Sequence, residues 1–222
     1  MNRAADQPEP NPLREGLSAR PVPQPCTIVI FGATGDLTHR KLVPALYNLV
    51  ADGELPPGVV IVGFARRDKS DDDFRRDIEE STRKFSRQPV RDEIWNAFAQ
   101  SIFYHRSEFG DEAGYEQLTK RLDDVDKSHG TRGNRLFYLA AGPDQFEPIL
   151  KNLKAAGLNQ TCKGSWARVI IEKPFGTDLA SARELNRVVR NSFTEEQTYR
   201  IDHFLGKAVS YTHLTLPTIC SV

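Results

Sequence analysis

The sequence has few cysteines, no net charge and no long apolar run. Its three cysteines, Cys26, Cys162 and Cys220, are scattered and form none of the close pairs that metal knuckles or redox motifs need. Thirty Lys and Arg residues balance thirty Asp and Glu residues, so the whole chain has no general attraction for nucleic acid. No apolar segment approaches the ~18 residues of a membrane-spanning helix, and no signal peptide is recognisable. We therefore expect a cytoplasmic protein that binds neither nucleic acid nor membranes.

The composition is that of a folded domain with one atypical end. Of the 222 residues, 39% are hydrophobic and 27% are charged, which is ordinary for a globular protein. Residues 1–25 hold six of the fourteen prolines and little that is apolar. Such a segment cannot bury enough surface to offset the entropy lost on ordering. The sequence predicts a disordered leader over 1–25.

From Cys26 onward, apolar β-branched runs alternate with segments of helical periodicity. Strands are predicted at "CTIVIF", "GVVIVGF", "SIFYH", "NRLFYLA", "ARVIIEKPFG" and "QTYRID". The alternation favours an α/β fold with a doubly wound, Rossmann-like and mainly parallel sheet over residues 26–202. In such sheets, ligands bind at the carboxyl ends of the strands.

The first strand runs into the turn "GATGDL", Gly32 to Leu37. Gly32 allows a sharp reversal, Gly35 allows a phosphate to approach the backbone, and Asp36 is placed to cap the following helix. Thr38 occupies the place of the third glycine of the usual dinucleotide fingerprint. Taken alone, the turn is as consistent with a simple tight turn as with a cofactor cradle.

The second strand ends in "GFARR", which contains Arg66 and Arg67. NAD-binding folds have an acidic residue here for the ribose 2′-hydroxyl, whereas NADP-binding folds need a cation for the 2′-phosphate. Two solvated surface arginines are the simpler alternative. Combined with the glycine turn, the arginines favour NADP.

Two later motifs contain charged and titratable side chains that could bind a substrate or take part in catalysis. "EKPFG" places Lys173 at a strand's carboxyl end, followed by Pro174, which can be cis and direct that lysine. "RIDHFLGK" contains Asp202, His203 and Lys207. The last two, four residues apart, share a helix face suited to a phosphate, and the carboxylate is suited to orienting a catalytic histidine. Each motif alone is also compatible with an ordinary surface turn or helix cap.

His39, His105 and His129 are isolated histidines without partner spacing, so no metal site is expected.

Four motifs in this order, "GATGDL", "GFAR", "EKPFG" and "RIDHFLGK", resemble the glucose-6-phosphate dehydrogenase family, and the similarity runs from about Cys26 to Lys207. The resemblance implies oxidation of glucose 6-phosphate at C1, with hydride transfer to NADP, to give the 6-phospholactone at the entry of the pentose phosphate pathway. It also implies that the full-length parent is a homo-oligomer.

The resemblance assigns roles residue by residue. The residues that match the family's cofactor contacts are Gly32, Ala33, Thr34, Gly35, Asp36, Leu37, Arg66, Tyr138 and Lys173. Its substrate contacts are Lys173, His203 and Lys207, and Asp202 matches the aspartate that pairs with the general base. Pro174 matches a cis proline, and Glu108 is expected beside the nicotinamide.

The end of the chain departs from the family. Residues 203–207 are expected to begin a second α+β domain, most of which is missing, and the family's catalytic histidine lies beyond them. Residues 208–222, "AVSYTHLTLPTICSV", carry no charged residue and resemble translated adapter sequence. We therefore expect a fragment that is inactive alone. The alternatives are another NADP-dependent oxidoreductase and a non-catalytic NADP-binding domain.

Overall fold

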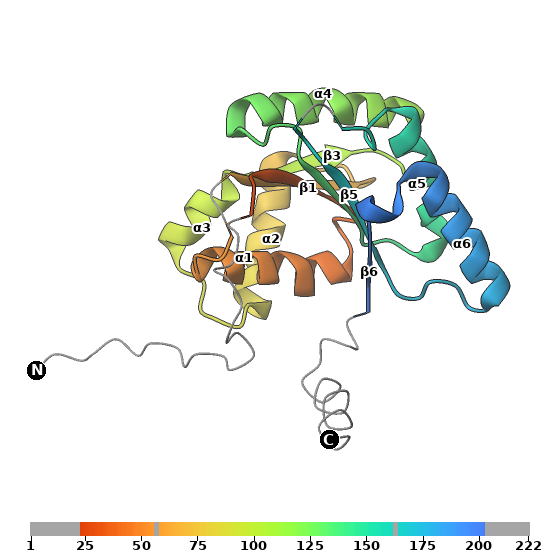
Figure 1. The fold of residues 1–222 in the computed structure, drawn as a ribbon. Coiled ribbons are helices and arrows are strands. Elements are labelled where there is room, and N and C mark those ends of the chain that lie inside the picture. The colour runs from red at the N-terminus through yellow and green to blue at the C-terminus, as the bar shows by residue number, and fades with distance from the viewer. Residues whose placement is uncertain (1–22, 56–57, 162–163, 203–222) are drawn as a thin grey trace, which may run out of the picture.

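The computed structural model describes residues 23–55, 58–161 and 164–202, and these form one α/β layer structure (Figure 1). Its six strands are β1 (Cys26–Phe31), β2 (Val59–Ala65), β3 (Ile102–Arg106), β4 (Arg135–Leu139), β5 (Ala167–Glu172) and β6 (Thr198–Ile201). They lie at the places that the apolar runs predict. Each β-branched, apolar run suits a strand that is buried in a sheet.

The sheet is parallel throughout, with strand order β3-β2-β1-β4-β5-β6. The chain first moves outward from β1 to β2 and β3, then returns to the other side of β1 with β4. In register, Ile30 lies beside Gly63 of β2 and Tyr138 of β4. The order therefore reverses at β1, and a crevice opens there at the carboxyl ends of the strands.

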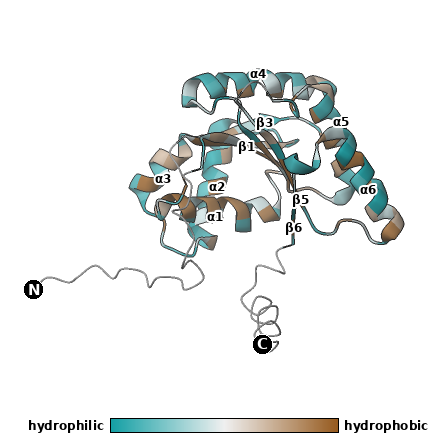
Figure 2. Cartoon of the chain, in the orientation of Figure 1, coloured by the Kyte–Doolittle hydropathy of each residue, from teal (hydrophilic) through white to brown (hydrophobic). Residues whose placement is uncertain are grey.

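Three helices cover each face of the sheet, as the doubly wound fold predicts. One layer contains α1 (Val43–Ala51), α2 (Asp71–Phe85) and α3 (Asp92–Ala99). The other contains α4 (Glu112–His129), α5 (Phe146–Ala155) and α6 (Leu179–Ser192). The helices turn hydrophobic residues toward the sheet and hydrophilic residues outward (Figure 2). The short turns η3 (Pro143–Gln145) and η4 (Glu195–Gln197) precede α5 and β6.

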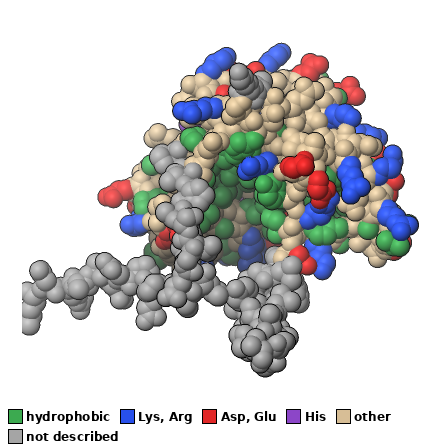
Figure 3. Space-filling model, in the orientation of Figure 1, with side chains coloured by type: hydrophobic (Ala, Val, Ile, Leu, Met, Phe, Trp, Pro, Cys, Tyr) green, Lys and Arg blue, Asp and Glu red, His purple; other side chains and the backbone are tan. Residues whose placement is uncertain are grey.

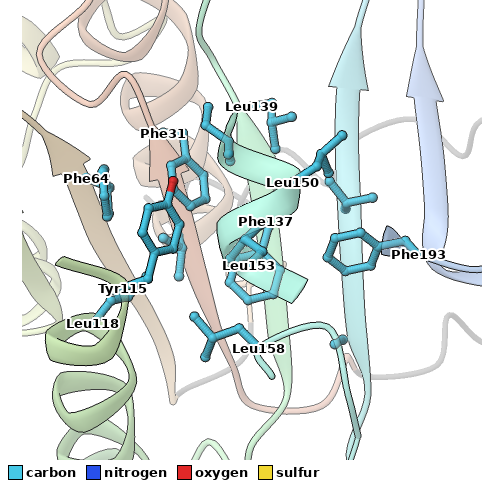
Figure 4. Close-up of a cluster of buried hydrophobic side chains, with 14 of the residues drawn as sticks. Phe31, Phe64, Tyr115, Leu118, Phe137, Leu139, Leu150, Leu153, Leu158 and Phe193 are labelled. Atoms are coloured by element: carbon cyan, nitrogen blue, oxygen red, sulfur yellow. The ribbon is translucent and has the colours of Figure 1, made fainter. Parts of the chain in front are cut away.

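The larger core cluster lies between the sheet and the layer of α4, α5 and α6 (Figure 4). Phe31, Phe64 and Phe137 point from neighbouring strands into it, and Tyr115 of α4 packs beside Phe31 with the ring centroids 6.1 Å apart. Side chains of this size contribute about 1.5–3 kcal/mol each when fully buried. This cluster holds the carboxyl ends of β1, β2 and β4 in a fixed relation.

The helix after the glycine turn contains a π-helical turn, η2 (Thr38–Leu42), and continues as α1. Pro44 is the second residue of α1 and directly follows this π-helical turn, so it lies in the first turn of α1, one of the two placements that the sequence allows. Gly53 follows the helix with a φ of +69°, as expected of a residue that ends it.

Three domain predictions lie wholly or mostly outside the described residues: the leader, the start of a second domain at 203–207, and the tail at 208–222. The last two residues of the predicted leader contact the domain. The side chain of Gln24 accepts a hydrogen bond from Trp166 Nε1 (3.1 Å), and the carbonyl of Pro25 accepts one from Asn134 Nδ2 (3.0 Å). Within the described part of the chain, no helix is long and apolar enough to cross a membrane.

Candidate functional site

A cleft of about 430 Å³ opens at the crevice predicted by the strand order. It is lined by Gly32, Thr34, Gly35, Ala65, Arg66, Arg67, Ser107, Glu108, Phe109, Ala140, Ala141, Gly142 and Gln145. These residues lie at or just after the carboxyl ends of β1, β2, β3 and β4. The glycine turn and the two arginines, which are far apart in the sequence, therefore meet in one concave site.

Gly32 makes the turn that opens the cleft. Its φ is +87°, a left-handed backbone conformation that favours glycine, and its N–H donates to the carbonyl of Phe64 (3.0 Å). A Cβ at this position would lie 2.3 Å from the carbonyl oxygen of Ala140. Only glycine therefore allows the end of β1 to approach the end of β4 this closely.

Thr38 closes the turn from the helix side. Its side chain is fully buried, and its hydroxyl donates to the carbonyl oxygen of Gly32 (3.2 Å), which also accepts from the N–H of Gly35 (2.9 Å). The residue in the place of the third glycine thus makes a hydrogen bond that glycine cannot make. Replacing the third glycine of the usual fingerprint by threonine therefore does not open the turn.

The remaining residues of the predicted cradle lie around the cleft without lining it. Ala33 is buried in the core beneath the turn, and its N–H donates to the carbonyl of Phe64 (3.2 Å). The prediction that Asp36 caps the helix is wrong, because its carboxylate pairs with Arg40 (3.2 Å) and the helix start has no side-chain cap. Leu37 lies in the first turn of the helix, half-buried.

Arg66 and Arg67 form the cationic side of the cleft, and both side chains are exposed. Tyr104 fixes the backbone beneath them, since its hydroxyl donates to the carbonyls of Ala65 (3.1 Å) and Arg67 (2.6 Å). The carboxylate of Asp68, which follows them, pairs with Arg106 (3.0 Å). The end of β2 therefore presents two guanidinium groups to the cleft.

The segment after β3, the strand next to β2, forms a further wall of the cleft, and the exposed side chain of Glu108 lines it. The carbonyl of Phe109 accepts hydrogen bonds from Tyr115 (3.0 Å) and from Asn152 (3.0 Å), which tie this wall to α4 and α5. Sequence reasoning missed Ser107, Phe109, Ala140, Ala141, Gly142 and Gln145. Their position just after β3 and β4, on either side of the switch point, is the signal that would have found them.

A second group of polar side chains lies at the carboxyl ends of β4, β5 and β6. The ammonium of Lys173 pairs with the carboxylate of Asp202 (3.1 Å), and the peptide bond from Lys173 to Pro174 is cis, as predicted. The hydroxyl of Tyr138 donates to the carboxylate of Glu172. Burial, and then this carboxylate, raise the pKa of the Tyr138 hydroxyl above its ordinary value, so the phenol stays protonated. The predicted residues of these three strands therefore lie together, although none of them lines the cleft.

Two of the three histidines in the described part of the chain, His105 and His39, contact partners away from the cleft. His105 is buried, and its ring Nε2 lies 2.8 Å from the carbonyl of Gly114. The Nδ1 of His39 lies 2.7 Å from the hydroxyl of Ser81. His203 and Lys207, the predicted phosphate ligands, lie outside the described residues. Among the described side chains, no group of three or more His, Cys, Asp or Glu residues is arranged to hold a metal ion.

The cleft fits a dinucleotide by shape and by charge. Its glycine turn brings backbone, without side chains, to the start of a helix, where N–H groups and the helix dipole favour a phosphate. The two arginines lie one strand away, where the ribose of a bound dinucleotide lies in folds of this type. Strand order, turn and cleft together define a dinucleotide-binding domain of the Rossmann class.

Comparison with known proteins gives the family. The model described as "Glucose-6-phosphate dehydrogenase, NAD binding domain" matches residues 29–210. A glucose-6-phosphate 1-dehydrogenase of Chlamydia pneumoniae is 48% identical over 90% of this chain, and one of Chlamydia muridarum is 46% identical over 92%. A solved glucose-6-phosphate dehydrogenase in complex with its substrate glucose 6-phosphate superimposes with a TM-score of 0.76 at 34% identity over 92% of this chain. The chain therefore belongs to the glucose-6-phosphate dehydrogenase family and contains its nicotinamide-cofactor domain.

The chain spans only part of these relatives. The matches cover 40% and 41% of the two Chlamydia proteins, and 41% of the solved chain.

Proposed function

We propose that the cleft binds NADP in preference to NAD. The observation that carries this proposal is the pair of exposed guanidinium groups at the end of β2, where an NAD-binding fold would need a free carboxylate. Arg66 is the contact for the 2′-phosphate, and the turn from Gly32 to Gly35 holds the diphosphate. A guanidinium binds a phosphate through two parallel, charge-assisted hydrogen bonds.

We further propose that the full-length protein oxidises glucose 6-phosphate at C1 to the 6-phosphoglucono-lactone, the first step of the pentose phosphate pathway. Bound NADP supplies the hydride acceptor. Lys173 contacts both the sugar and the cofactor, and its contact with Asp202 supports this placement, since it brings the two predicted residues together at 3.1 Å. His203 and Lys207 hold the substrate phosphate. Asp202 orients the general base, a histidine that belongs to the following domain.

We expect no turnover from this chain alone. A general base must come within hydrogen-bond reach of the C1 hydroxyl. None of the described histidines, His39, His105 and His129, lines the cleft. His39 contacts Ser81 of α2, and His105 of β3 contacts Gly114 of α4. His213, in the atypical tail, has no sequence context that suits it to this role. The domain supplies cofactor binding and part of the substrate site.

The cytoplasm is the proposed location, and a homo-oligomer is the proposed state of the full-length protein. The cysteine pattern supports the first proposal, since Cys26 is a buried free thiol. A relative from Arabidopsis thaliana, 37% identical, carries the word cytoplasmic in its name. Sedimentation of the full-length protein tests the second proposal.

The full-length protein, purified and mixed with glucose 6-phosphate and NADP, tests the activity through NADPH absorbance. We expect reduction of NADP that depends on glucose 6-phosphate and that is lost in the Lys173→Ala variant. A Lys151→Ala variant serves as the matched control, because that lysine pairs with Glu147 on α5, outside the cleft. Reduction with another sugar phosphate, but not with this one, would refute the assignment.

A further inference from the structure

The guanidinium of Arg66 is directed by its backbone alone. The side chain is exposed at the end of β2 and lines the cleft. Among the described residues, none forms a hydrogen bond or an ion pair with this guanidinium. A long side chain that nothing holds points where its backbone and its rotamers direct it. The orientation of the guanidinium therefore depends on what fixes the backbone from Ala65 to Arg67.

One buried hydroxyl fixes that backbone on both sides of Arg66. Tyr104 of β3 shares its phenolic proton between the carbonyls of Ala65 (3.1 Å) and Arg67 (2.6 Å). The Ala65 carbonyl also accepts from the N–H of Ser107 (3.1 Å), whereas only Tyr104, of the described donors, reaches the Arg67 carbonyl. Burial raises the pKa of the Tyr104 hydroxyl above its ordinary value, so the phenol keeps the proton that it donates.

Tyr104 is itself held by two helices. Its ring lies 5.1 Å from that of Phe74 of α2, and Gly63 makes room for Phe74, since a Cβ there would lie 2.6 Å from the Phe74 ring. β3 is the edge strand of the described sheet, and the N–H of Tyr104 donates to the carboxylate of Asp71 (2.7 Å). That carboxylate also accepts from Arg121 of α4 (2.6 Å). The hydroxyl therefore has a fixed position relative to both helix layers.

The other contact near the two arginines is a weaker restraint. Asp68 pairs with Arg106 at 3.0 Å, but both side chains are exposed. Figure 3 shows many charged side chains over the outer helices, where water surrounds them. Exposed ion pairs of this kind contribute little, because water screens the charges and both side chains lose freedom. The buried hydroxyl of Tyr104 is thus the main restraint on this segment.

We propose that Tyr104 is a positioning residue for cofactor selection, whose hydroxyl holds Arg66 in the orientation from which its guanidinium binds the 2′-phosphate. The inference rests on the proposed preference of the cleft for NADP. Tyr104 does not line the cleft, so it acts through Arg66. Paired hydrogen bonds between guanidinium and phosphate require an exact geometry, so a looser backbone weakens NADP binding. NAD has no 2′-phosphate and loses nothing.

The test measures the dissociation constants of NADP and NAD for this chain and for Tyr104→Phe, which removes the hydroxyl and keeps the ring. We expect NADP binding to weaken about three- to tenfold while NAD binding stays unchanged, so that the ratio of the two constants changes by the same factor. Tyr47→Phe is the matched control. Tyr47 is buried, its hydroxyl accepts from the N–H of Arg91 (2.8 Å), and it does not line the cleft. This variant should leave both constants unchanged, even where it lowers the melting temperature.

A double-mutant cycle separates positioning from a general effect on the fold. In the Arg66→Ala background, Tyr104→Phe should have no further effect on NADP binding, because the group that it positions is gone. An equal loss in both backgrounds, an equal loss for NADP and NAD, or an unchanged ratio overturns the role of Tyr104 and leaves the NADP preference standing. If the unsubstituted chain does not prefer NADP, the proposed function itself fails, and the role of Tyr104 fails with it.

Discussion

The hydroxyl of Thr38 donates a hydrogen bond to the carbonyl oxygen of Gly32, over 3.2 Å, across the turn that opens the cofactor cleft. Thr38 stands in the place of a glycine that helps the helix pack against the strand in the usual fingerprint. Here the threonine is fully buried and stabilises the turn from the inside. The departure from the fingerprint is thus compensated within the turn itself.

Restoring the glycine should therefore weaken the domain. We expect Thr38→Gly to lower the free energy of unfolding by about 1–3 kcal/mol, since it removes a buried side chain and its hydrogen bond and adds backbone entropy. Thr38→Val keeps the volume of the side chain, and the carbonyl of Gly32 still accepts from the N–H of Gly35. We therefore expect this variant to lower the free energy of unfolding by only about 0.5–1.5 kcal/mol. Urea unfolding followed by the fluorescence of the buried Trp95 measures both. A Thr38→Gly variant as stable as the unsubstituted chain would show that the contact contributes nothing.

Gly32 should tolerate a methyl group far less than Gly53 does. Both have positive φ, +87° and +69°, so alanine costs about 1–2 kcal/mol at either from the backbone alone. At Gly32 the added Cβ also meets the Ala140 carbonyl at 2.3 Å, whereas at Gly53 nothing lies within 4 Å. We expect Gly32→Ala to cost at least about 1–3 kcal/mol more than Gly53→Ala, because the strand ends must move apart. Equal melting temperatures for the two variants would contradict the close approach of β1 and β4.

Stability should fall as the pH is lowered from 7.5 to 5.5. Burial lowers the pKa of His105, and of His39, below the ordinary value, which is about 6.5 in the unfolded chain. As the pH falls, the unfolded chain takes up these protons first, so the stability present above about pH 6.5 is lost as the pH falls toward the folded pKa.

Urea unfolding at three pH values in this range measures the slope. A His105→Gln variant should show a shallower slope than the unsubstituted chain, whatever its absolute stability, because it removes one of the two groups. Identical slopes would mean that His105 titrates alike in the folded and unfolded chain.

The sequence predicted the strands and allowed a cis bond before Pro174, because apolar period and turn chemistry are local properties, whereas the switch point became visible only with the strand order. It predicted Gly32, Gly35 and Arg66 correctly as neighbours, since parallel strands bring their carboxyl ends together. Phe109 and Gln145, which line the cleft, were not predicted as site residues. Their side chains have no chemistry that indicates a binding site, and only the strand order shows that they lie beside it. The cap expected from Asp36 is absent because Asp36 is itself helical and therefore does not occupy the N-cap position.

The contact between Lys173 and Asp202 could be expected only from the family resemblance. The two residues are 29 positions apart and meet because β5 and β6 are neighbours in the sheet. Likewise, the different burial of the strands is not visible in the sequence: Ile170 of β5 lies in an apolar run like those of β1 and β2, yet it is only half-buried. Burial on two faces is a property of the packed layers, not of one segment.

The central claim is that this cleft binds NADP through Arg66. The most direct measurement is the dissociation constants of NADP and of NAD for this chain, for Arg66→Ala and for Arg76→Ala, an arginine of α2 that does not line the cleft and pairs with Asp73. We predict tighter binding of NADP than of NAD. We also predict that Arg66→Ala weakens NADP binding by about 1.5–3 kcal/mol, roughly ten- to a hundredfold, while NAD binding and the Arg76→Ala variant stay unchanged. Tighter binding of NAD, or equal NADP affinity after Arg66→Ala, would contradict the account.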